Sequence, residues 1–336
     1  MDAETTPDAA SSYHPLRPSR SQFVEVRGLT YHLRCWGDPS LVSPERPPLV
    51  LLHGWMDVGA SFQFIVDALH AQGDAPRYII ALDWRGFGLT YERSRTKVHA
   101  DTYWFPDYLA DLDQILDVVL GPRATGDVAG QGTAKIDLLG HSMGGNASML
   151  YAGVRPERIR RLVNLEGFGM PDTRPASAPQ RYITWLDELA SPATLNSYED
   201  LPAVARRLQR NNPLLAADKA DWIAGYWAAP SEDGRLHLLA DPAHKQIAPT
   251  VYRADEVLAV WQRIAAPMLL IEGDRSDMRV FWGDRYSREE FERRIAVVRD
   301  VTRRMASPAG HMIHHDQPGQ VARWLGGFLA DGNIPE

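Results

Sequence analysis

A serine flanked by glycines is the residue of this sequence best suited to nucleophilic chemistry. Ser142 is the centre of a Gly-His-Ser-Met-Gly pentapeptide at 140–144, which follows an apolar run at 136–139 and precedes a segment with helical spacing. A Gly-x-Ser-x-Gly sequence between a strand and a helix is typical of a sharp turn that exposes the serine hydroxyl. The glycines prevent a clash that larger side chains would cause in such a turn. The pattern predicts that Ser142 is a nucleophile rather than an incidental serine in a glycine-rich turn.

A second glycine-containing segment supplies candidate hydrogen-bond donors for a negatively charged oxygen. His53, Gly54 and Trp55 follow an apolar run at 49–52. This segment would present a backbone amide at the carboxyl end of its strand. Together with the amide of Met143, it could form an oxyanion hole for a tetrahedral intermediate. We interpret His53 as a positioning histidine and not as a catalytic base.

The elements that must position these residues alternate between strand and helix. Short apolar runs at 49–52, 78–82, 136–139 and 162–165 are each typical of a strand covered by helices on both faces. Segments at 62–69 and 108–120 between them have helical spacing. The alternation predicts an α/β fold with a doubly wound, mostly parallel sheet.

Other elements are expected on either side of this core pattern. A hairpin is predicted at 23–36 around Arg27 and Gly28, and a loop at 122–133, which is rich in small residues. Another apolar run, typical of a buried strand, lies at 268–271. Ser287 and Glu290 form a capping-box signal for a helix that extends to about Arg299. A last amphipathic helix is expected at 321–329.

The segment between residues 170 and 264 reads as helix and loop. We therefore predict a flexible tail at 1–20, an α/β core at 21–169 and 265–336, and an inserted helical cap at 170–264. Four aromatic residues of the cap are candidates for contact with an apolar substrate, although helical spacing is also typical of plain core packing. They are Trp185, Trp222, Tyr226 and Trp227.

Four short blocks, in this order along the chain, resemble the signature sequences of the α/β-hydrolase superfamily. The blocks are His53-Gly54-Trp55, the Asp-Trp-Arg-Gly-Phe-Gly run at 83–88, the Gly-His-Ser-Met-Gly-Gly run at 140–145 and the Gly-His-Met-Ile-His run at 310–314. The resemblance covers roughly residues 23–329, and the cap is similar to that of bacterial relatives of the serine-hydrolase-like proteins. It implies that Ser142 is the nucleophile, that His311 is the base, and that Trp55 and Met143 provide the oxyanion-hole amides.

A cluster of histidines near the C-terminus could contain the catalytic base, or it could bind a metal ion. In this fold the order along the chain is serine, acid, histidine, which favours His311 as the base. His311, His314 and His315 could instead bind a metal, but no second cluster of aspartate, glutamate or histidine with ligand spacing accompanies them. The sequence therefore predicts no metal and no cofactor.

Three carboxylates are candidates for the acid that orients the imidazole. Asp274 and Asp277 follow the predicted strand at 268–271, and Glu166 ends the preceding strand. We favour Asp277 because it lies deeper in the loop, where its side chain could reach over the edge of the sheet. The Gly-Asp-Arg-Ser-Asp run at 273–277 resembles a variant of some family members in which the acid follows a serine, and this also points to Asp277. The sequence departs here from the more usual spacing, which would put the acid at Ser276, a residue that cannot serve.

Composition excludes several classes of protein. The 336 residues are 44% hydrophobic and 24% charged, values that are ordinary for globular proteins, and the formal net charge of −7 argues against nucleic acid or anionic membranes as partners. The single cysteine, Cys35, can form neither an internal disulfide nor a thiolate cluster. No apolar run approaches membrane-spanning length and residues 1–20 lack a signal-peptide core, so we expect a cytoplasmic protein with a small-molecule substrate.

A serine nucleophile narrows the reaction class. Dehalogenases and epoxide hydrolases of this fold attack through a carboxylate, whereas serine suits acyl transfer. The sequence therefore predicts a serine hydrolase that acts most simply on a carboxylic ester with an apolar acyl or ring portion. The alternatives are a non-hydrolytic enzyme of the same fold, carbon–carbon cleavage, and a binding protein with a decayed site. The sequence gives no prediction of the oligomeric state.

Overall fold

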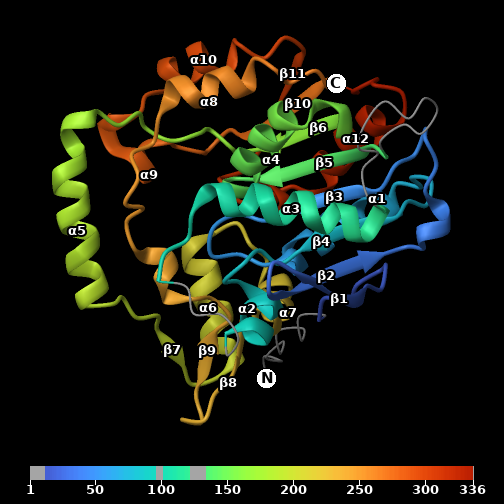
Figure 1. The fold of residues 1–336 in the computed structure, drawn as a ribbon. Helices are drawn as coiled ribbons and strands as arrows, with labels where there is room; N and C mark the ends of the chain where they lie inside the picture. Colours follow the sequence, from blue (N-terminus) through green and yellow to red (C-terminus); the bar gives the residue numbers. More distant parts are fainter. Residues whose placement is uncertain (1–11, 96–100, 122–133, 336) are drawn as a thin grey trace, which may run out of the picture.

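A twisted sheet runs through the middle of the protein in the computed structural model, which describes residues 12–95, 101–121 and 134–335 (Figure 1). In these residues the sheet has eight strands in the order β1-β2-β4-β3-β5-β6-β10-β11. The hairpin strands β1 and β2 pair antiparallel with each other, β2 is antiparallel to β4, and all other neighbours are parallel. The predicted doubly wound, mostly parallel sheet is therefore confirmed. The strands are β1 (Arg20–Val26), β2 (Leu29–Trp36), β3 (Leu49–Leu52), β4 (Ile79–Leu82), β5 (Ile136–His141), β6 (Ile159–Leu165), β10 (Met268–Gly273) and β11 (Val301–Ala306).

Helices cover both faces of this sheet, which is why its central strands are apolar throughout. Successive side chains of β3 point to opposite faces, so Leu49 and Leu51 join one buried cluster and Val50 and Leu52 the other. The cluster that contains Leu49 and Leu51 lies under α1 (Gln63–Ala71) and α12 (Pro318–Ala330). The cluster that contains Val50 and Leu52 lies under α3 (Phe105–Leu120) and α4 (Met143–Val154). The remaining helices are α2 (Gly88–Ser94), α5 (Ala178–Ala190), α6 (Leu201–Asn211), α7 (Ala217–Trp227), α8 (Ala254–Trp261), α9 (Arg279–Trp282), α10 (Arg288–Ile295) and α11 (Ile313–Asp316).

Local signals predicted two element boundaries well. Arg27 and Gly28, both at positive φ, form the turn between β1 and β2. The Ser287 hydroxyl accepts the Glu290 amide hydrogen at 3.2 Å and begins α10, as the capping signal predicted. The helix ends at Ile295 and not near Arg299, because the chain turns so that Val298 packs into the core. The predicted loop at 122–133 lies outside the described residues.

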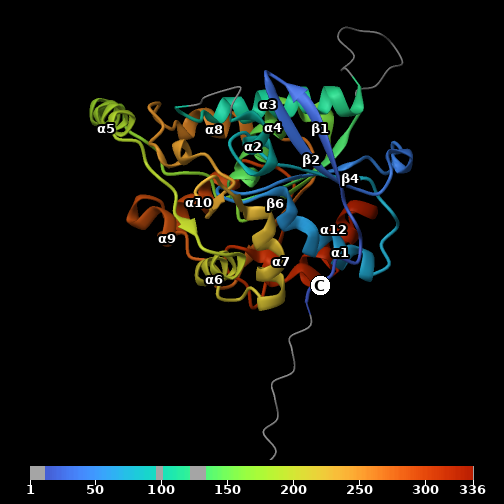
Figure 2. The same cartoon turned by 90° about the horizontal axis from the view of Figure 1, so that it is seen from below.

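The cap differs from the prediction of helix and loop. Besides α5, α6 and α7 it contains a small antiparallel sheet of β7 (Ser197–Tyr198), β9 (Leu236–Leu238) and β8 (Ala228–Pro230). These strands have two or three residues each, which is too short for a recognisable alternation of apolar and polar residues. Helix α8 lies within the range predicted for the cap, 170–264, but it packs on α4 of the core: a Cβ on Gly153 would lie 2.1 Å from the carbonyl oxygen of Val260. Figure 2 shows α5 standing away from the core.

The N-terminal segment is ordered further toward its beginning than predicted. The amides of Leu16 and Arg17 donate to the Asp67 carboxylate of α1 at 3.0 and 2.9 Å, and the Tyr13 hydroxyl donates to the same group. Residues 13–17 are therefore bound to the core rather than part of a flexible tail, while residues 1–11 lie outside the described part of the chain. Within the described residues, the longest apolar helices fall short of what crossing a membrane would require.

Candidate active site

Ser142 lies on a sharp turn between β5 and α4. Its φ of 51° is in the left-handed region, which is strained for a residue with a side chain. The turn is tightly enclosed, because a Cβ on Gly140 would lie 2.1 Å from the Gly144 carbonyl oxygen and a Cβ on Gly144 would lie 2.1 Å from that of Leu52. Both glycines of the pentapeptide are therefore required by close backbone contacts, as the sequence pattern indicated.

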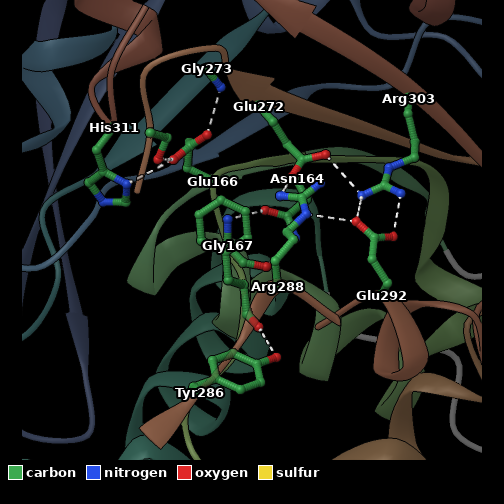
Figure 3. A network of polar contacts seen from close by, with 12 residues as sticks. Asn164, Glu166, Gly167, Glu272, Gly273, Tyr286, Arg288, Glu292, Arg303 and His311 are labelled. Atoms are coloured by element: carbon green, nitrogen blue, oxygen red, sulfur yellow. Dashed lines mark hydrogen bonds and ion pairs between the residues drawn. The ribbon is translucent and has the colours of Figure 1, made fainter. Parts of the chain in front are cut away.

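The imidazole of His311 contacts the Ser142 hydroxyl. It lies in the loop between β11 and α11, and its Nε2 is 2.9 Å from Ser142 Oγ. Its Nδ1 is 3.1 Å from Oε2 of Glu166, and Figure 3 shows these two side chains pointing toward each other. A hydroxyl, an imidazole and a carboxylate are thus connected in series, which is the arrangement that lets a hydroxyl lose its proton to the imidazole as it attacks.

Glu166 is held at the end of β6 by contacts with the neighbouring loop after β10. Its φ is 60°, and the amide of Gly273 donates to Oε1 at 2.7 Å. The Ser276 hydroxyl donates to Oε2, the same oxygen that faces His311. The residue is only 1% exposed. The buried carboxylate therefore accepts hydrogen bonds from the Gly273 amide and the Ser276 hydroxyl and faces the imidazole Nδ1 of His311.

The expectation that Asp277 contacts the imidazole is corrected by this geometry. Asp277 turns outward, with its side chain 47% exposed, and accepts the backbone amide hydrogen of Arg279 at 2.9 Å and its guanidinium at 3.3 Å. An aspartate that caps the amide two residues ahead forms a local turn and cannot also reach across the sheet. Asp274 is also engaged elsewhere, since it accepts from the Ser307 hydroxyl at 2.6 Å and the Ala309 amide at 2.8 Å.

Burial acts on both members of the Glu166–His311 pair. Burial raises the pKa of Glu166 to about 8, while the Ser276 hydroxyl and the Gly273 amide oppose that rise. Burial also lowers the pKa of His311 to about 4, which favours the neutral imidazole that can accept a proton. Because the groups interact directly, proton uptake belongs to the pair and not to either residue alone.

A network of charged side chains adjoins Glu166. Glu272, which directly precedes Gly273, is buried and pairs with Arg288 and, at 3.0 Å, with Arg303 (Figure 3). Arg303 also contacts Glu292. Glu272 raises the pKa of Glu166 and Arg288 lowers it. The guanidinium of Arg288 thus favours the ionised form of Glu166.

The segment that carries Trp55 passes beside Ser142. A Cβ on Gly54 would lie 3.2 Å from the Cβ of Ser142, so the chain reaches the serine only because residue 54 is glycine. His53 accepts the amide hydrogen of Trp84 on Nε2 at 2.9 Å, and its carbonyl accepts the Trp84 indole at 3.0 Å. These contacts are those of a positioning histidine. Met143, whose amide is the other predicted donor, begins α4 directly after Ser142.

The four cap aromatics are placed mainly as packing groups. Trp222 and Tyr226 contact each other at 4.7 Å between ring centroids, and Trp222 also packs edge-on against Tyr13 and Phe64. Trp227 packs into the same apolar cluster, which joins the cap to α1. The Trp185 indole donates to the Thr102 hydroxyl at 2.9 Å. The contacts of Trp222, Tyr226 and Trp227 are therefore those of packing groups that join the cap to the core, the alternative that their helical spacing also indicated. Contact of these residues with a substrate stays a prediction.

Two exposed aromatic side chains lie near the site, and sequence reasoning did not identify either of them as a candidate for contact with substrate. The Phe281 ring lies 4.6 Å from the His311 ring although Phe281 is 46% exposed, and the Trp55 side chain is 51% exposed. A cavity of about 450 Å³ opens beside Glu166, with Phe168, Met278 and Tyr286 among its lining residues. The apolar Val-Phe-Trp run at 280–282, which begins three residues after Asp277, was the signal that could have identified Phe281.

Comparisons with known proteins agree with this architecture. A serine hydrolase-like protein of Dictyostelium discoideum is 25% identical over 90% of this chain and 79% of its own length. An sn-1-specific diacylglycerol lipase of Xenopus laevis is 32% identical over 43% of this chain and 39% of its own. Among solved structures, the thioesterase domain of the curacin biosynthetic pathway superposes with a TM-score of 0.72 at 23% identity, covering 91% of this chain and 98% of that domain.

The family is established by a match over most of the chain. Residues 49–324 fit the sequence model of the alpha/beta hydrolase family, and this range contains the turn at Ser142, the glutamate at the end of β6 and the histidine before α11. The sheet order and the helices on both faces agree with that assignment. The chain therefore belongs to the alpha/beta hydrolase family.

Proposed function

We propose that this protein is a serine hydrolase that cleaves a carboxylic ester through an acyl-enzyme, with Ser142, His311 and Glu166 as its catalytic triad. The observation that carries the proposal is the pair of contacts of one imidazole, 2.9 Å to the Ser142 hydroxyl and 3.1 Å to the Glu166 carboxylate. The strained φ of Ser142 supports the same role, because it presents the hydroxyl at the carboxyl edge of the sheet.

The chemistry follows from the positions of these groups. Ser142 Oγ attacks the ester carbonyl carbon while His311 Nε2 takes its proton, and the amides of Trp55 and Met143 stabilise the resulting oxyanion. The imidazolium then protonates the departing alcohol, leaving an acyl group on Ser142. Water, deprotonated by the same imidazole, attacks the acyl carbon, and the acid is released as Oγ regains its proton. Glu166 fixes the tautomer of His311 and stabilises its positive charge.

The substrate we infer is a small molecule with an apolar acyl or ring portion. Trp55 and Phe281 expose aromatic surface near the reacting groups, and Phe281 touches the His311 ring. Burial of such rings against an apolar group would supply binding free energy without a charged partner. The names of the lipase and thioesterase relatives support acyl chemistry without defining the acyl group.

A covalent-labelling experiment tests the proposal. Wild type and Ser142→Ala are incubated with a fluorophosphonate and analysed by intact-protein mass spectrometry, and both are assayed on esters and thioesters graded by acyl length. We expect one adduct per wild-type chain, none on Ser142→Ala, and ester hydrolysis that depends on Ser142. Labelling without hydrolysis of any ester or thioester would instead indicate a non-hydrolytic enzyme on this fold, and Ser142→Ala with unchanged hydrolysis would exclude the proposed nucleophile.

A further inference from the structure

A cluster of buried polar side chains lies directly beneath the site and plays no part in the proposed reaction. Asp57, His141 and His314 each offer one ligand-type atom, and these three atoms lie within 4.8 Å of one another. All three residues are buried, with at most 3% of their surface exposed. They come from the segment before α1, the end of β5 and α11, so no spacing within the sequence connects them.

The atoms that face one another in this cluster lack hydrogen bonds. Within the described part of the chain, Oδ2 of Asp57, Nδ1 of His141 and both ring nitrogens of His314 have no hydrogen-bond partner. The separation between His314 Nε2 and Asp57 Oδ2 is 3.6 Å, which is too long for a hydrogen bond. Buried polar atoms are satisfied in the great majority of native proteins, so the convergence of several unsatisfied ones indicates a bound species.

The remaining polar atoms of His141 and Asp57 are held as they are in metal sites. His141 Nε2 lies 2.9 Å from the carbonyl oxygen of His311, and Asp57 Oδ1 accepts from the Val58 amide at 2.8 Å and from the Ser61 hydroxyl. Ligand histidines commonly donate their second N–H to a backbone carbonyl, and ligand carboxylates are themselves hydrogen-bonded. Such contacts orient His141 Nδ1 and Asp57 Oδ2 toward the centre of the cluster.

Space beside the cluster depends on a glycine. A Cβ on Gly54 would lie 2.9 Å from His141 Nδ1, so the glycine leaves that nitrogen accessible. Ligand atoms around a tetrahedral zinc ion at 2.0–2.1 Å are about 3.3 Å apart. Small rotations of the two rings and the carboxylate would bring the three atoms from within 4.8 Å to that separation.

From these contacts we propose that Asp57, His141 and His314 form a buried binding site for a divalent transition-metal ion, with zinc as the best fit. Two neutral imidazoles and one carboxylate match the nitrogen and oxygen donors that zinc prefers, and a water would complete four-fold coordination. The site is separate from the reacting atoms, because the Ser142 hydroxyl and the His311 ring are not among its ligands.

The position of the ligands gives the ion a structural role. Asp57 is two residues after Trp55, His141 directly precedes Ser142, and His314 is three residues after His311. An ion bound to all three would join the oxyanion segment, the nucleophile turn and the histidine loop at one point. It would act as a positioning element that stabilises their mutual geometry.

The test uses the full chain after chelator treatment and dialysis, titrated separately with Zn²⁺ and Co²⁺. We expect one zinc per chain by native mass spectrometry, a visible absorption band from tetrahedral Co²⁺, and a rise in melting temperature of roughly 5 °C or more when zinc is at a hundred times its Kd. Asp57→Asn and His314→Gln should lose the band and the rise. Circular dichroism of each metal-free variant checks that it is folded.

Two controls separate this site from other histidines. His315→Gln alters the neighbouring buried histidine, and His311→Ala removes the imidazole of the proposed triad; both should keep the Co²⁺ band and the one-zinc stoichiometry. The proposal is overturned if wild type binds no zinc, if folded His314→Gln binds it as wild type does, or if His311→Ala abolishes binding. If Asp57→Asn fails to fold, His314→Gln alone decides.

Discussion

Replacing Glu166 by glutamine tests the part of the site that sequence reasoning placed elsewhere. The amide has the size of the carboxylate, but the Gly273 N–H, 2.7 Å from Oε1, requires an oxygen at that position. The substituted amide must therefore place its oxygen toward Gly273 and its NH₂ toward His311 Nδ1. A donor at that nitrogen forces the imidazole proton onto Nε2, where it points at Ser142 Oγ and prevents the imidazole from accepting the hydroxyl proton.

The expected loss of activity in Glu166→Gln follows from two functions of the carboxylate that the amide cannot perform. The imidazole takes the wrong tautomer, and the imidazolium loses a buried negative charge 3.1 Å away. A comparable change in a serine protease triad lowers kcat about 10⁴-fold, so Glu166→Gln should raise the barrier by about 5 kcal/mol. We expect kcat/KM on the best activated ester to fall by this factor. Melting should show no loss of stability, because a desolvated charge has been removed.

Two matched variants decide the result. Asp277→Asn, which changes an exposed carboxylate bound to Arg279, should keep most of the wild-type kcat/KM. Ser276→Asp, made in the Glu166→Gln protein, should restore part of the activity, since the Ser276 hydroxyl already touches the oxygen that faces His311. If Glu166→Gln keeps more than about a tenth of the activity while Asp277→Asn loses about a thousandfold, the acid is Asp277 and the reasoning from the structure is wrong.

Three further predictions follow from the same geometry. Ser142→Ala should lower kcat by a factor on the order of 10³ or more with an unchanged melting temperature, and a smaller loss in freshly purified protein would exclude Ser142 as the nucleophile. The kcat/KM of wild type should fall as pH decreases, because the Glu166–His311 pair takes up a proton with an apparent pKa between about 4 and about 8. Glu166→Gln should move this acidic limb of the pH profile to lower pH, and an unmoved limb would contradict the pairing. Arg288→Met should move the acidic limb to higher pH, because the guanidinium lowers the pKa of Glu166; an unmoved limb would remove Arg288 from the electrostatics of the site.

The sheet and the strained turn at Ser142 were predictable because their signals are local. The apolar run at 49–52 became β3 with the predicted bounds, and the strained turn at Ser142 is dictated by the two glycines of its own pentapeptide. His311 could be placed because it follows a strand and precedes the last helices. In each case the residues that determine the structure lie within a few positions of one another.

The parts that sequence reasoning missed depend on contacts between distant segments. Glu166 meets His311 across 145 positions, and α8 joins the core because it packs against the small residue Gly153 of α4. The other residues of the proposed metal site also lie far from His314 in the sequence. The residues that converge on it, Asp57 and His141, come from two other strand ends.

The arrangement of β6 and β10 explains why the sequence offered candidates on two strands for the carboxylate that faces His311. β6 and β10 are adjacent and parallel, so residues just past their carboxyl ends lie side by side. A carboxylate from either strand can reach His311, provided that the other strand supplies donors to hold it. Here β6 provides Glu166, and the segment after β10 provides the Gly273 amide and the Ser276 hydroxyl. Serine at 276 is therefore the complement of a glutamate at 166, and the two positions should be interpreted together.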